Sequence, residues 1–378
     1  MRSASVQVVF AAALALGAAG CTANCACRAP AESAQAARPA AAPAPTPAPR
    51  LADGLPARPG PANVPRPAGA PGNLKILDWA GFTSAVSYTF DDGQPSQIEH
   101  YADLAAAGVR LTFFINSAGA SWEAGFADTF SRAVRDGHEV ANHTVHHCHA
   151  DPDGTLRAGC AGANIAAEFD ECTTFITKTL GAPAVWTSAS PFGDTGYVGA
   201  ATERFFLARG AMPGTVAPND ETDPFNLPIW GPAEHDGVEK FDAQIDRAHL
   251  GHRWVIMLLH SLGPTSFAWY MTVDVSAVTG SIAHAKSLGD VWIDSLANVG
   301  AYWRGQKLLA AVTPEVETTA AGTTQTWSWT LPPHFPPGKT LRVRVDGGTL
   351  SQNGKALEWN GHGYYEIALD AGSLTLSP

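Results

Sequence analysis

Two adjacent carboxylates, Asp91 and Asp92, are the residues of this chain best placed for chemistry, because they close an apolar stretch at residues 85–90. The stretch predicts a buried strand, and Gly93 behind it allows the backbone to turn sharply. Neighbouring side chains on a strand point in opposite directions. At the strand end, one carboxylate can therefore ligate a metal ion while the other faces the water held on that ion.

A cluster of four histidines supplies further ligands some fifty residues later. His143 and His147 are four residues apart, and on a helical turn such residues lie on one face. Two imidazoles and one carboxylate leave a coordination position open, as in a catalytic rather than a structural zinc site. His146 and His149 are also candidate ligands on chemical grounds, and the spacing favours His147. We therefore expect a hydrolytic metal site.

Over roughly residues 74–310 the chain resembles the polysaccharide deacetylases, the NodB-like family also called carbohydrate esterase family four. The resemblance rests on the Thr-Phe-Asp-Asp-Gly motif at residues 89–93 and the His-Thr-Val-His-His motif at residues 143–147. It implies that Asp91 is the catalytic base. It also implies a site for Zn²⁺, or another divalent transition metal such as Co²⁺, made of Asp92, His143 and His147.

Two more segments resemble motifs of the same family. The apolar run at residues 254–259 suits a buried strand and ends in His260, which resembles the general acid. The Pro-Phe-Gly sequence at residues 191–193 resembles the turn whose aromatic residue, here Phe192, donates its amide to the oxyanion. The family's further aspartate, which supports the catalytic histidine, has no clear counterpart; Asp236 and Glu234 are possible by spacing only.

One position departs from the family pattern. Where the family usually has an arginine paired with the catalytic aspartate, this chain has Ala189. An opposite charge lowers the pKa of a carboxyl and fixes its side chain. Without that arginine, Asp91 must be oriented by the metal, by the neighbourhood of Asp92, or by a basic residue from elsewhere in the chain.

Two functions therefore remain open. The first is a metal-dependent deacetylase that removes N- or O-acetyl groups from a carbohydrate polymer. In it, water held on the metal attacks the acetyl carbonyl, Asp91 takes the proton, the metal and the Phe192 amide hold the oxyanion, and His260 protonates the leaving group. The alternative is a catalytically weak or inactive metal- and glycan-binding protein of the same fold.

Apolar and amphipathic segments alternate between residues 85 and 310, which predicts an α/β domain with a parallel sheet and helices outside it. The resemblance implies that the sheet closes into a distorted (β/α)7-type barrel. Strands are expected at residues 85–90, 111–115, 139–142, 184–188, 254–259 and 291–294, and helices at residues 96–107, 122–135, 164–180, 199–208, 275–288 and 295–310.

After residue 312, short alternating strands predict a small all-β, sandwich-like domain. Trp327, Trp329 and Trp359 could form a sugar-stacking face there, but aromatic residues of small β domains more often belong to the core. We therefore expect a structural role for this domain.

The first residues have the features of an export signal. Arg2 is followed by an apolar stretch at residues 8–19 that is too short to span a membrane. The Gly-Cys pair that follows resembles a lipoprotein cleavage site, so we expect lipidation of Cys21, with simple secretion as the alternative. An exported protein is expected either way: a cell-envelope lipoprotein, or else a periplasmic or extracellular protein.

Residues rich in Ala and Pro follow, and they predict an extended tether without a core. The expected organisation is therefore a signal peptide, a tether, a catalytic domain and a small β domain, at residues 1–20, 21–72, 73–311 and 312–378.

Six cysteines suit an exported protein, and three of them surround the segment after the histidine motif. Cys160 and Cys172 would lie about 18 Å apart along one helix, beyond the reach of a disulfide. Cys148 is therefore the expected common partner, with Cys160 favoured as the other half. The net charge of −11 argues against nucleic acid or an anionic membrane surface as a partner and is compatible with an acetylated, mostly neutral glycan.

Overall fold

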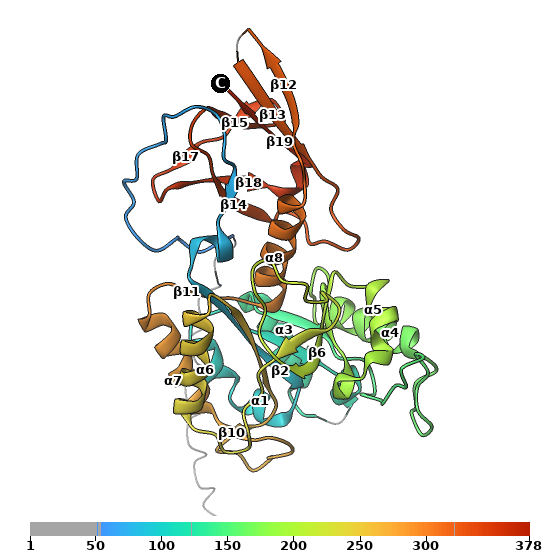
Figure 1. Cartoon of the computed structure of the whole chain (residues 1–378). Coiled ribbons are helices and arrows are strands. Elements are labelled where there is room, and N and C mark those ends of the chain that lie inside the picture. The colour runs from blue at the N-terminus through green and yellow to red at the C-terminus, as the bar shows by residue number, and fades with distance from the viewer. Residues whose placement is uncertain (1–50, 52–53, 122, 321) are drawn as a thin grey trace, which may run out of the picture. The chain divides into compact units, whose positions relative to one another are not determined.

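The computed structural model describes residues 51, 54–121, 123–320 and 322–378 (Figure 1). The expected signal peptide, the lipidation site Cys21 and residues 21–50 of the expected tether lie outside the described residues. Among the described residues, no helix has both the length and the apolar character needed to cross a bilayer.

A ring of parallel strands forms the centre of the catalytic region. Neighbouring strands pair in chain order from β2 to β7, and β8 pairs with β2 on its other side. Trp230, which follows β7, closes the ring, because its amide donates to Ile256 O (2.8 Å) and its carbonyl accepts from Leu258 N (2.9 Å). The expected seven-stranded barrel is confirmed. Its strands are β2 (Ser84–Asp92), β3 (Thr112–Ile115), β4 (Glu139–Asn142), β5 (Thr187–Ala189), β6 (Leu207–Pro213), β7 (Leu227–Ile229) and β8 (Trp254–Leu259).

Helices connect these strands, and β11 (Val291–Ile293) pairs with the first residues of β2. Side chains of Asn164, Asp274 and Ser295 accept backbone amides at the starts of α4, α7 and α8, which satisfies donors that a helix start leaves free. Figure 1 shows α6 and α7 side by side against the barrel. The helices are α1 (Pro95–Glu99), α2 (Tyr101–Ala106), α3 (Phe126–Asp136), α4 (Ile165–Lys178), α5 (Val198–Thr202), α6 (Val238–Leu250), α7 (Val275–Ser287) and α8 (Leu296–Ala310).

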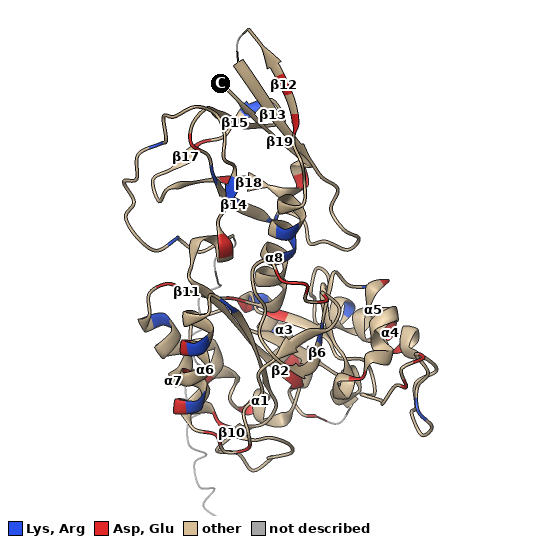
Figure 2. Ribbon diagram, in the orientation of Figure 1, with Lys and Arg blue, Asp and Glu red and all other residues tan. Residues whose placement is uncertain are grey.

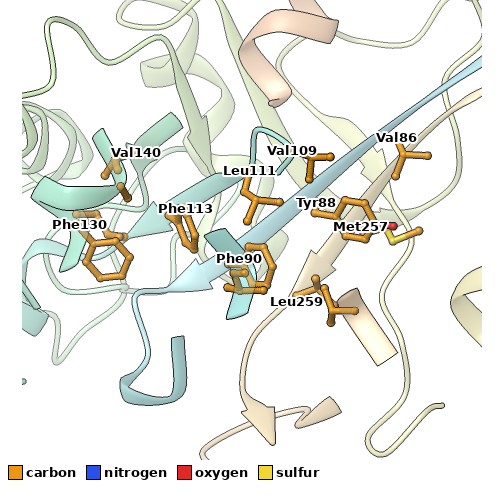
Figure 3. Close-up of a cluster of buried hydrophobic side chains, with 14 of the residues drawn as sticks. Val86, Tyr88, Phe90, Val109, Leu111, Phe113, Phe130, Val140, Met257 and Leu259 are labelled. Carbon is orange, nitrogen blue, oxygen red and sulfur yellow. The ribbon is translucent and has the colours of Figure 1, made fainter. Parts of the chain in front are cut away.

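Buried apolar side chains between the barrel strands and the helices fix the strand that carries the two carboxylates. Figure 3 shows Phe90 of β2 beside Phe113 of β3, with Phe130 of α3 on the other side of Phe113. The rings of Phe90 and Phe113 stack with centroids 5.3 Å apart. Full burial of one such side chain stabilises the fold by about 2–3 kcal/mol. The end of β2 is therefore held firmly in place.

Two antiparallel sheets form the C-terminal region, as expected, and their apolar side chains share one core. Trp327 and Trp329 are buried in it, and Trp359 is half-buried with its indole N–H bonded to Val64 O. One sheet has the order β1 (Lys75–Ile76), β14 (Thr340–Arg344), β18 (Tyr364–Ala368) and β17 (Trp359–Asn360). The other has the order β12 (Glu315–Thr319), β13 (Gly322–Ser328), β19 (Ser373–Ser377), β15 (Thr349–Gln352) and β16 (Lys355–Ala356).

Residues 54–72, the described end of the proline-rich segment, lie along this β region. Val64 N donates to Gly361 O (2.8 Å), and Asp346 N donates to Gly72 O (3.0 Å). The strand β1 that follows belongs to the same sheet as β14. The backbone of this segment is therefore partly satisfied by the β region, although its composition cannot form a core of its own.

Several expected elements differ from those observed. The helix expected at residues 96–107 is divided at His100 into α1 and α2, and the helix expected at residues 199–208 ends at Thr202. The strands β6 and β7 and the helix α6 were not expected at all. In β6 the reason is visible, because Arg209 and Gly210 interrupt the apolar character by which a buried strand is recognised.

Candidate active site

Asp91 and Asp92 stand at the carboxyl end of β2, where the chain leaves the barrel. Asp91 is only 3% exposed. Asp92 has a left-handed backbone with φ of 74°, which redirects its side chain as the strand ends. Its Oδ2 accepts a hydrogen bond of 2.9 Å from the side chain of Gln94, which itself accepts one from the Ser261 hydroxyl. One carboxylate oxygen of Asp92 is thus held, and Oδ1 is turned toward the histidines.

The histidine motif follows β4 as a loop, not as the helical turn that the spacing suggested. Thr144 and His147 both have positive φ, 69° and 53°. Thr144 N donates to the Asn142 side chain (2.8 Å), and His147 N donates to the Thr144 hydroxyl (3.1 Å). These local bonds, and not helical geometry, bring His143 and His147 together, with ring centroids 4.6 Å apart.

A buried glutamate on α4 holds the loop from outside. Glu168 Oε2 accepts the amides of Val145 (3.0 Å) and His146 (2.8 Å), and its Oε1 lies 2.7 Å from His146 Nδ1. His149 is engaged in the same way by Asp194, at 2.9 Å. The two alternative histidine ligands therefore have other partners.

Asp92, His143 and His147 form a group that can hold a metal ion, with donor atoms within 4.8 Å of one another. The Nε2 atoms of both histidines lie 3.5 Å from Asp92 Oδ1. Ligands about 2.0–2.1 Å from a tetrahedral zinc ion are about 3.3 Å apart. His143 Nδ1 is bonded to Ala189 O at 2.9 Å, which leaves Nε2 as the lone-pair donor. The donor set and its spacing thus fit a divalent transition metal.

Burial, together with the neighbouring His143, lowers the pKa of His147 to about 4. Its ring is therefore neutral at neutral pH and offers a lone pair, which is the form that binds a metal.

The charge partner of Asp91 is a basic residue from elsewhere in the chain, one of the three possibilities left by the alanine at position 189: Arg209 of β6. Its Nη2 lies 2.5 Å from Asp91 Oδ1 and also contacts Oδ2, and Arg209 is 1% exposed. Burial alone would raise the pKa of Asp91, but Arg209, followed by His143 and His260, outweighs burial and holds the pKa below its ordinary value of 3.8. Ala189 is the register partner of Arg209 in the β5–β6 pair. The arginine therefore comes from the neighbouring strand.

His260 follows β8 and faces the same cavity. Burial lowers the pKa of its imidazole, although Asp91 and Asp92 oppose the shift. Its ring packs against the edge of Tyr270, with centroids 4.9 Å apart. The side-chain amide of Gln97 donates to the backbone carbonyls of both Asp91 (2.6 Å) and His260 (3.0 Å). Base and acid are thus linked through one side chain.

Neither residue considered as a support for His260 contacts its ring. Asp236 accepts the amide of Ala233 at 2.8 Å, and Glu234 is exposed. Among the described residues, no side-chain hydrogen bond to the His260 imidazole is found.

Phe192 lies in a tight turn after β5 and has φ of 57°. The hydrogen bonds of this turn are donated by the amides of Gly193 and Asp194, and the Phe192 amide is not among them. The Phe192 ring stacks on His149, with centroids 3.5 Å apart, and meets the edge of His147 at 4.5 Å. The Phe192 ring therefore lies beside His147, one of the three residues that can hold a metal ion.

Part of the backbone strain of the described residues lies at this site. Asp92, Thr144, His147 and Phe192 all have positive φ although none is glycine. Such conformations cost about 1–3 kcal/mol each, persist only where the surroundings enforce them, and cluster at active sites. The surrounding structure must therefore hold these four residues in place.

These groups surround one cavity of about 550 Å³. Asp91, Asp92, His143, His147, Arg209 and His260 line its polar side. Apolar side chains complete it: Phe192, Ala211, Ile229, Pro232, Leu258, Tyr270 and Met271. The volume and the mixed lining are those of a small-molecule or substrate-unit site.

The segment after the histidine motif is fixed by a disulfide between Cys148 and Cys160. The third cysteine of this region, Cys172, is buried and free, and its thiol donates to Ile115 O. Tyr197 also donates to Cys148 O at 2.6 Å. The residue next to His147 is thus held by both a covalent and a hydrogen bond.

Part of the chain matches the model of a known protein family. Residues 83–201 match the model of the polysaccharide deacetylase family. Among solved structures, the chain is similar to a putative polysaccharide deacetylase from Mycobacterium smegmatis, with 15% identity, a TM-score of 0.42, and coverage of 65% of this chain and 96% of that one.

Two further solved structures are similar at comparable distance. One is a family 4 acetyl xylan esterase from Clostridium thermocellum in complex with a cobalt ion, with 19% identity, a TM-score of 0.37, and coverage of 57% and 90%. The other is the catalytic domain of a peptidoglycan N-acetylglucosamine deacetylase from Eubacterium rectale, with 18% identity, a TM-score of 0.37, and coverage of 57% and 90%. The two carboxylates, the histidine loop and the Phe192 turn all fall within residues 83–201, so the residues that match the polysaccharide deacetylase model include most of this site.

Proposed function

We propose that this protein is a metal-dependent deacetylase that hydrolyses N- or O-acetyl groups on a carbohydrate polymer. One observation carries the proposal: a buried carboxylate paired with an arginine, Asp91, lies beside a group of three metal-binding side chains in one cavity. The match of residues 83–201 to the polysaccharide deacetylase family supports the same reaction.

Asp92, His143 and His147 are the proposed ligands of Zn²⁺ or of another divalent transition metal such as Co²⁺. When bound, such an ion lowers the pKa of water and polarises a carbonyl group. Asp91 is ionised and fixed by Arg209, so it can accept the proton of the attacking water.

The Phe192 amide and His260 complete the proposed reaction. Phe192 lines the same cavity, and its amide is the proposed donor to the oxyanion that forms from the acetyl carbonyl. His260 lines the same cavity and is the proposed acid that donates a proton to the leaving amine or alcohol.

The alternative of an inactive metal- and glycan-binding protein was motivated by the alanine at position 189. Arg209 supplies the missing charge, so this motive no longer holds. Acetate release from a panel of N- and O-acetylated glycans decides between the two functions. The enzyme releases acetate, loses this activity with a chelator and regains it with added Zn²⁺. Binding of Zn²⁺ and oligosaccharide without any release of acetate contradicts the enzyme.

We also propose that the protein is exported and is anchored to the cell envelope by a lipid on Cys21, which would be its only contact with the membrane. The support is the amino-terminal sequence alone. Replacement of Cys21 with Ser should move the protein from the membrane fraction to the soluble fraction. Unchanged fractionation contradicts the lipid anchor and leaves simple secretion.

A further inference from the structure

The exposed aromatic side chains of this protein are concentrated beside the candidate active site. Among the described residues, four aromatic side chains are more than half exposed: Phe192 (53%), Phe267 (55%), Trp269 (55%) and Tyr270 (59%). Phe192 and Tyr270 line the cavity itself. Exposed apolar groups gathered in one place mark a binding surface more often than scattered ones do.

Three of these rings belong to one loop, residues 264–272, between β9 (Leu262–Gly263) and β10 (Val273–Asp274). The backbone of this loop is anchored. Trp269 N donates to the Ser261 hydroxyl (3.0 Å), and Ser261 N donates to Tyr270 O (3.2 Å). The rings therefore project from a fixed backbone, which reduces the entropy lost when a ligand binds.

The same serine connects the loop to the metal group. The Ser261 hydroxyl donates to Gln94 Oε1, and Gln94 Nε2 donates to Asp92 Oδ2 at 2.9 Å. Tyr270 itself packs on the ring of His260. The loop is thus positioned relative to both the proposed metal ligand and the proposed acid.

The loop at residues 264–272 has no charged side chains, which favours an uncharged ligand. Residues 264–272 contain no Asp, Glu, Lys or Arg, and Figure 2 shows the loop that leads into β10 in tan. An anionic polymer would find no cation on this loop, and the chain as a whole has a net charge of −11. A sugar ring has an apolar face of C–H bonds, which packs on an aromatic ring, while its hydroxyl groups stay in water.

We propose that Phe267, Trp269 and Tyr270 form a sugar-binding lip that holds uncharged sugar rings next to the acetylated one. The substrate is then a neutral acetylated glycan of several residues, not a small acetylated compound or an acidic polymer. This inference rests on the proposed function and adds the class of substrate to it.

Kinetics as a function of chain length test the lip. The substrates are the hexamer and the dimer of N-acetylglucosamine, acetylated xylohexaose and xylobiose, and p-nitrophenyl acetate. For the wild type, we expect kcat/KM to be higher for one of the hexamers than for its dimer. The double variant Phe267→Ala/Trp269→Ala should lose this advantage, by on the order of tenfold. It should hydrolyse p-nitrophenyl acetate at the wild-type rate.

Two controls separate stacking from general effects. The variant Leu250→Ala/Val316→Ala removes two exposed apolar side chains elsewhere and should keep the length dependence. Trp269→Phe keeps an aromatic ring at the lip and should keep most of the dependence of kcat/KM on chain length. Equal melting temperatures of the wild type and the double variant establish that the lip variant is folded.

The lip is wrong if the double variant retains the full preference for the hexamer, or if a galacturonate hexamer inhibits as well as an uncharged deacetylated hexamer. If the wild type turns over none of these substrates, the proposed function fails. Calorimetric titration with both neutral hexamers then still tests the lip. Binding of a hexamer by the wild type but not by the double variant supports the lip as a sugar-binding surface of a protein that is not an enzyme. Absence of binding to the wild type overturns the lip.

Discussion

Ala189 and Arg209 are direct neighbours across the β5–β6 pair, and the arginine reaches from there to Asp91. Adjacent strands are about 4.8 Å apart, so a long side chain on either strand can reach the same carboxylate. An arginine at position 189, where the resembled family usually has one, and the arginine at position 209 could therefore reach the same carboxylate, although the two positions are twenty residues apart in the sequence.

Replacement of Arg209 should impair the reaction itself. Arg209→Met leaves Asp91 buried without its cation, so the pKa of Asp91 should rise and its side chain should lose its fixed orientation. We expect kcat to fall on the order of 100-fold and the acid limb of the pH–rate profile to move to higher pH. Steady-state kinetics across pH 4–8 on an acetylated oligosaccharide measure both effects.

A swap of the two positions gives the decisive comparison. The double variant Ala189→Arg/Arg209→Ala should recover part of the activity that Arg209→Met loses. Arg204→Ala removes an arginine whose partner is Asp170 on the surface, at 2.7 Å, and should leave kcat unchanged. If Arg209→Met has the kcat and the pH profile of the wild type, Arg209 does not position the base.

The histidine loop predicts which side chains a metal needs. His143→Ala or His147→Ala should abolish tight Zn²⁺ binding, because each removes one of three ligands. His149→Ala should keep most of the binding, since this ring is bonded to Asp194. Isothermal titration with Zn²⁺ after removal of bound metal measures the affinities.

His146→Ala tests the assignment of the ligands more strictly. Its ring is bonded to Glu168, and we expect the variant to retain most Zn²⁺ binding. Loss of the metal in His146→Ala with retention in His147→Ala would reverse the assignment of the second histidine.

Replacement of Asp91 should affect turnover alone, whereas replacement of Asp92 should also affect metal binding. Asp91→Asn should remove nearly all acetate release while Zn²⁺ stays bound, because Asp92 and both histidines remain. Asp92→Asn should weaken the metal as well. Zinc content and acetate release, measured on the same preparations, decide the point; a turnover close to the wild type in Asp91→Asn excludes Asp91 as the base.

A buried histidine outside the site should make stability depend on pH. Burial lowers the pKa of His138 to about 4 from its ordinary 6.5, and its Nδ1 accepts the amide of Leu111. Between pH 6.5 and pH 4 the unfolded chain protonates His138 more readily than the folded chain does. The free energy of unfolding therefore has its full value above pH 6.5 and decreases as the pH falls toward 4. The difference corresponds to about 3 kcal/mol.

His138→Asn keeps an acceptor for the Leu111 amide but cannot be protonated. The free energy of unfolding in urea should therefore fall less between pH 7 and pH 5 in this variant than in the wild type. The same loss with pH in both proteins would show that His138 is not responsible.

The sequence allowed prediction of the groups that stand at the ends of well-marked strands. Asp91, Asp92 and His260 follow continuous apolar runs, so both their strands and their positions were recognisable. The barrel itself was taken from family resemblance, since alternation of elements does not reveal whether a sheet closes. Trp230, which closes it, lies in no regular strand.

Arg209 was missed together with the strand that carries it. In the sequence, an arginine next to a glycine is typical of a surface segment. The ion pair that lets Arg209 be buried is made with Asp91, which is distant in the sequence. The conformation of the histidine loop was equally inaccessible, because it depends on Glu168 of α4 and on two residues with positive φ. Long-range ion pairs and strained loops are set by tertiary contacts, not by local pattern.

Trp230 closes the barrel beside the candidate active site, and its two backbone hydrogen bonds to β8 break when the barrel opens there. Ile229 and Gly231, on either side of Trp230, line the cavity, and the amide of Leu258 is protected by the Trp230 carbonyl. Hydrogen–deuterium exchange at Trp230 and Leu258 therefore measures how often this seam opens. A glycan that fills the cavity should slow exchange at these two amides more than at the amides that hydrogen-bond β8 to β2, so backbone exchange reports whether the site is occupied.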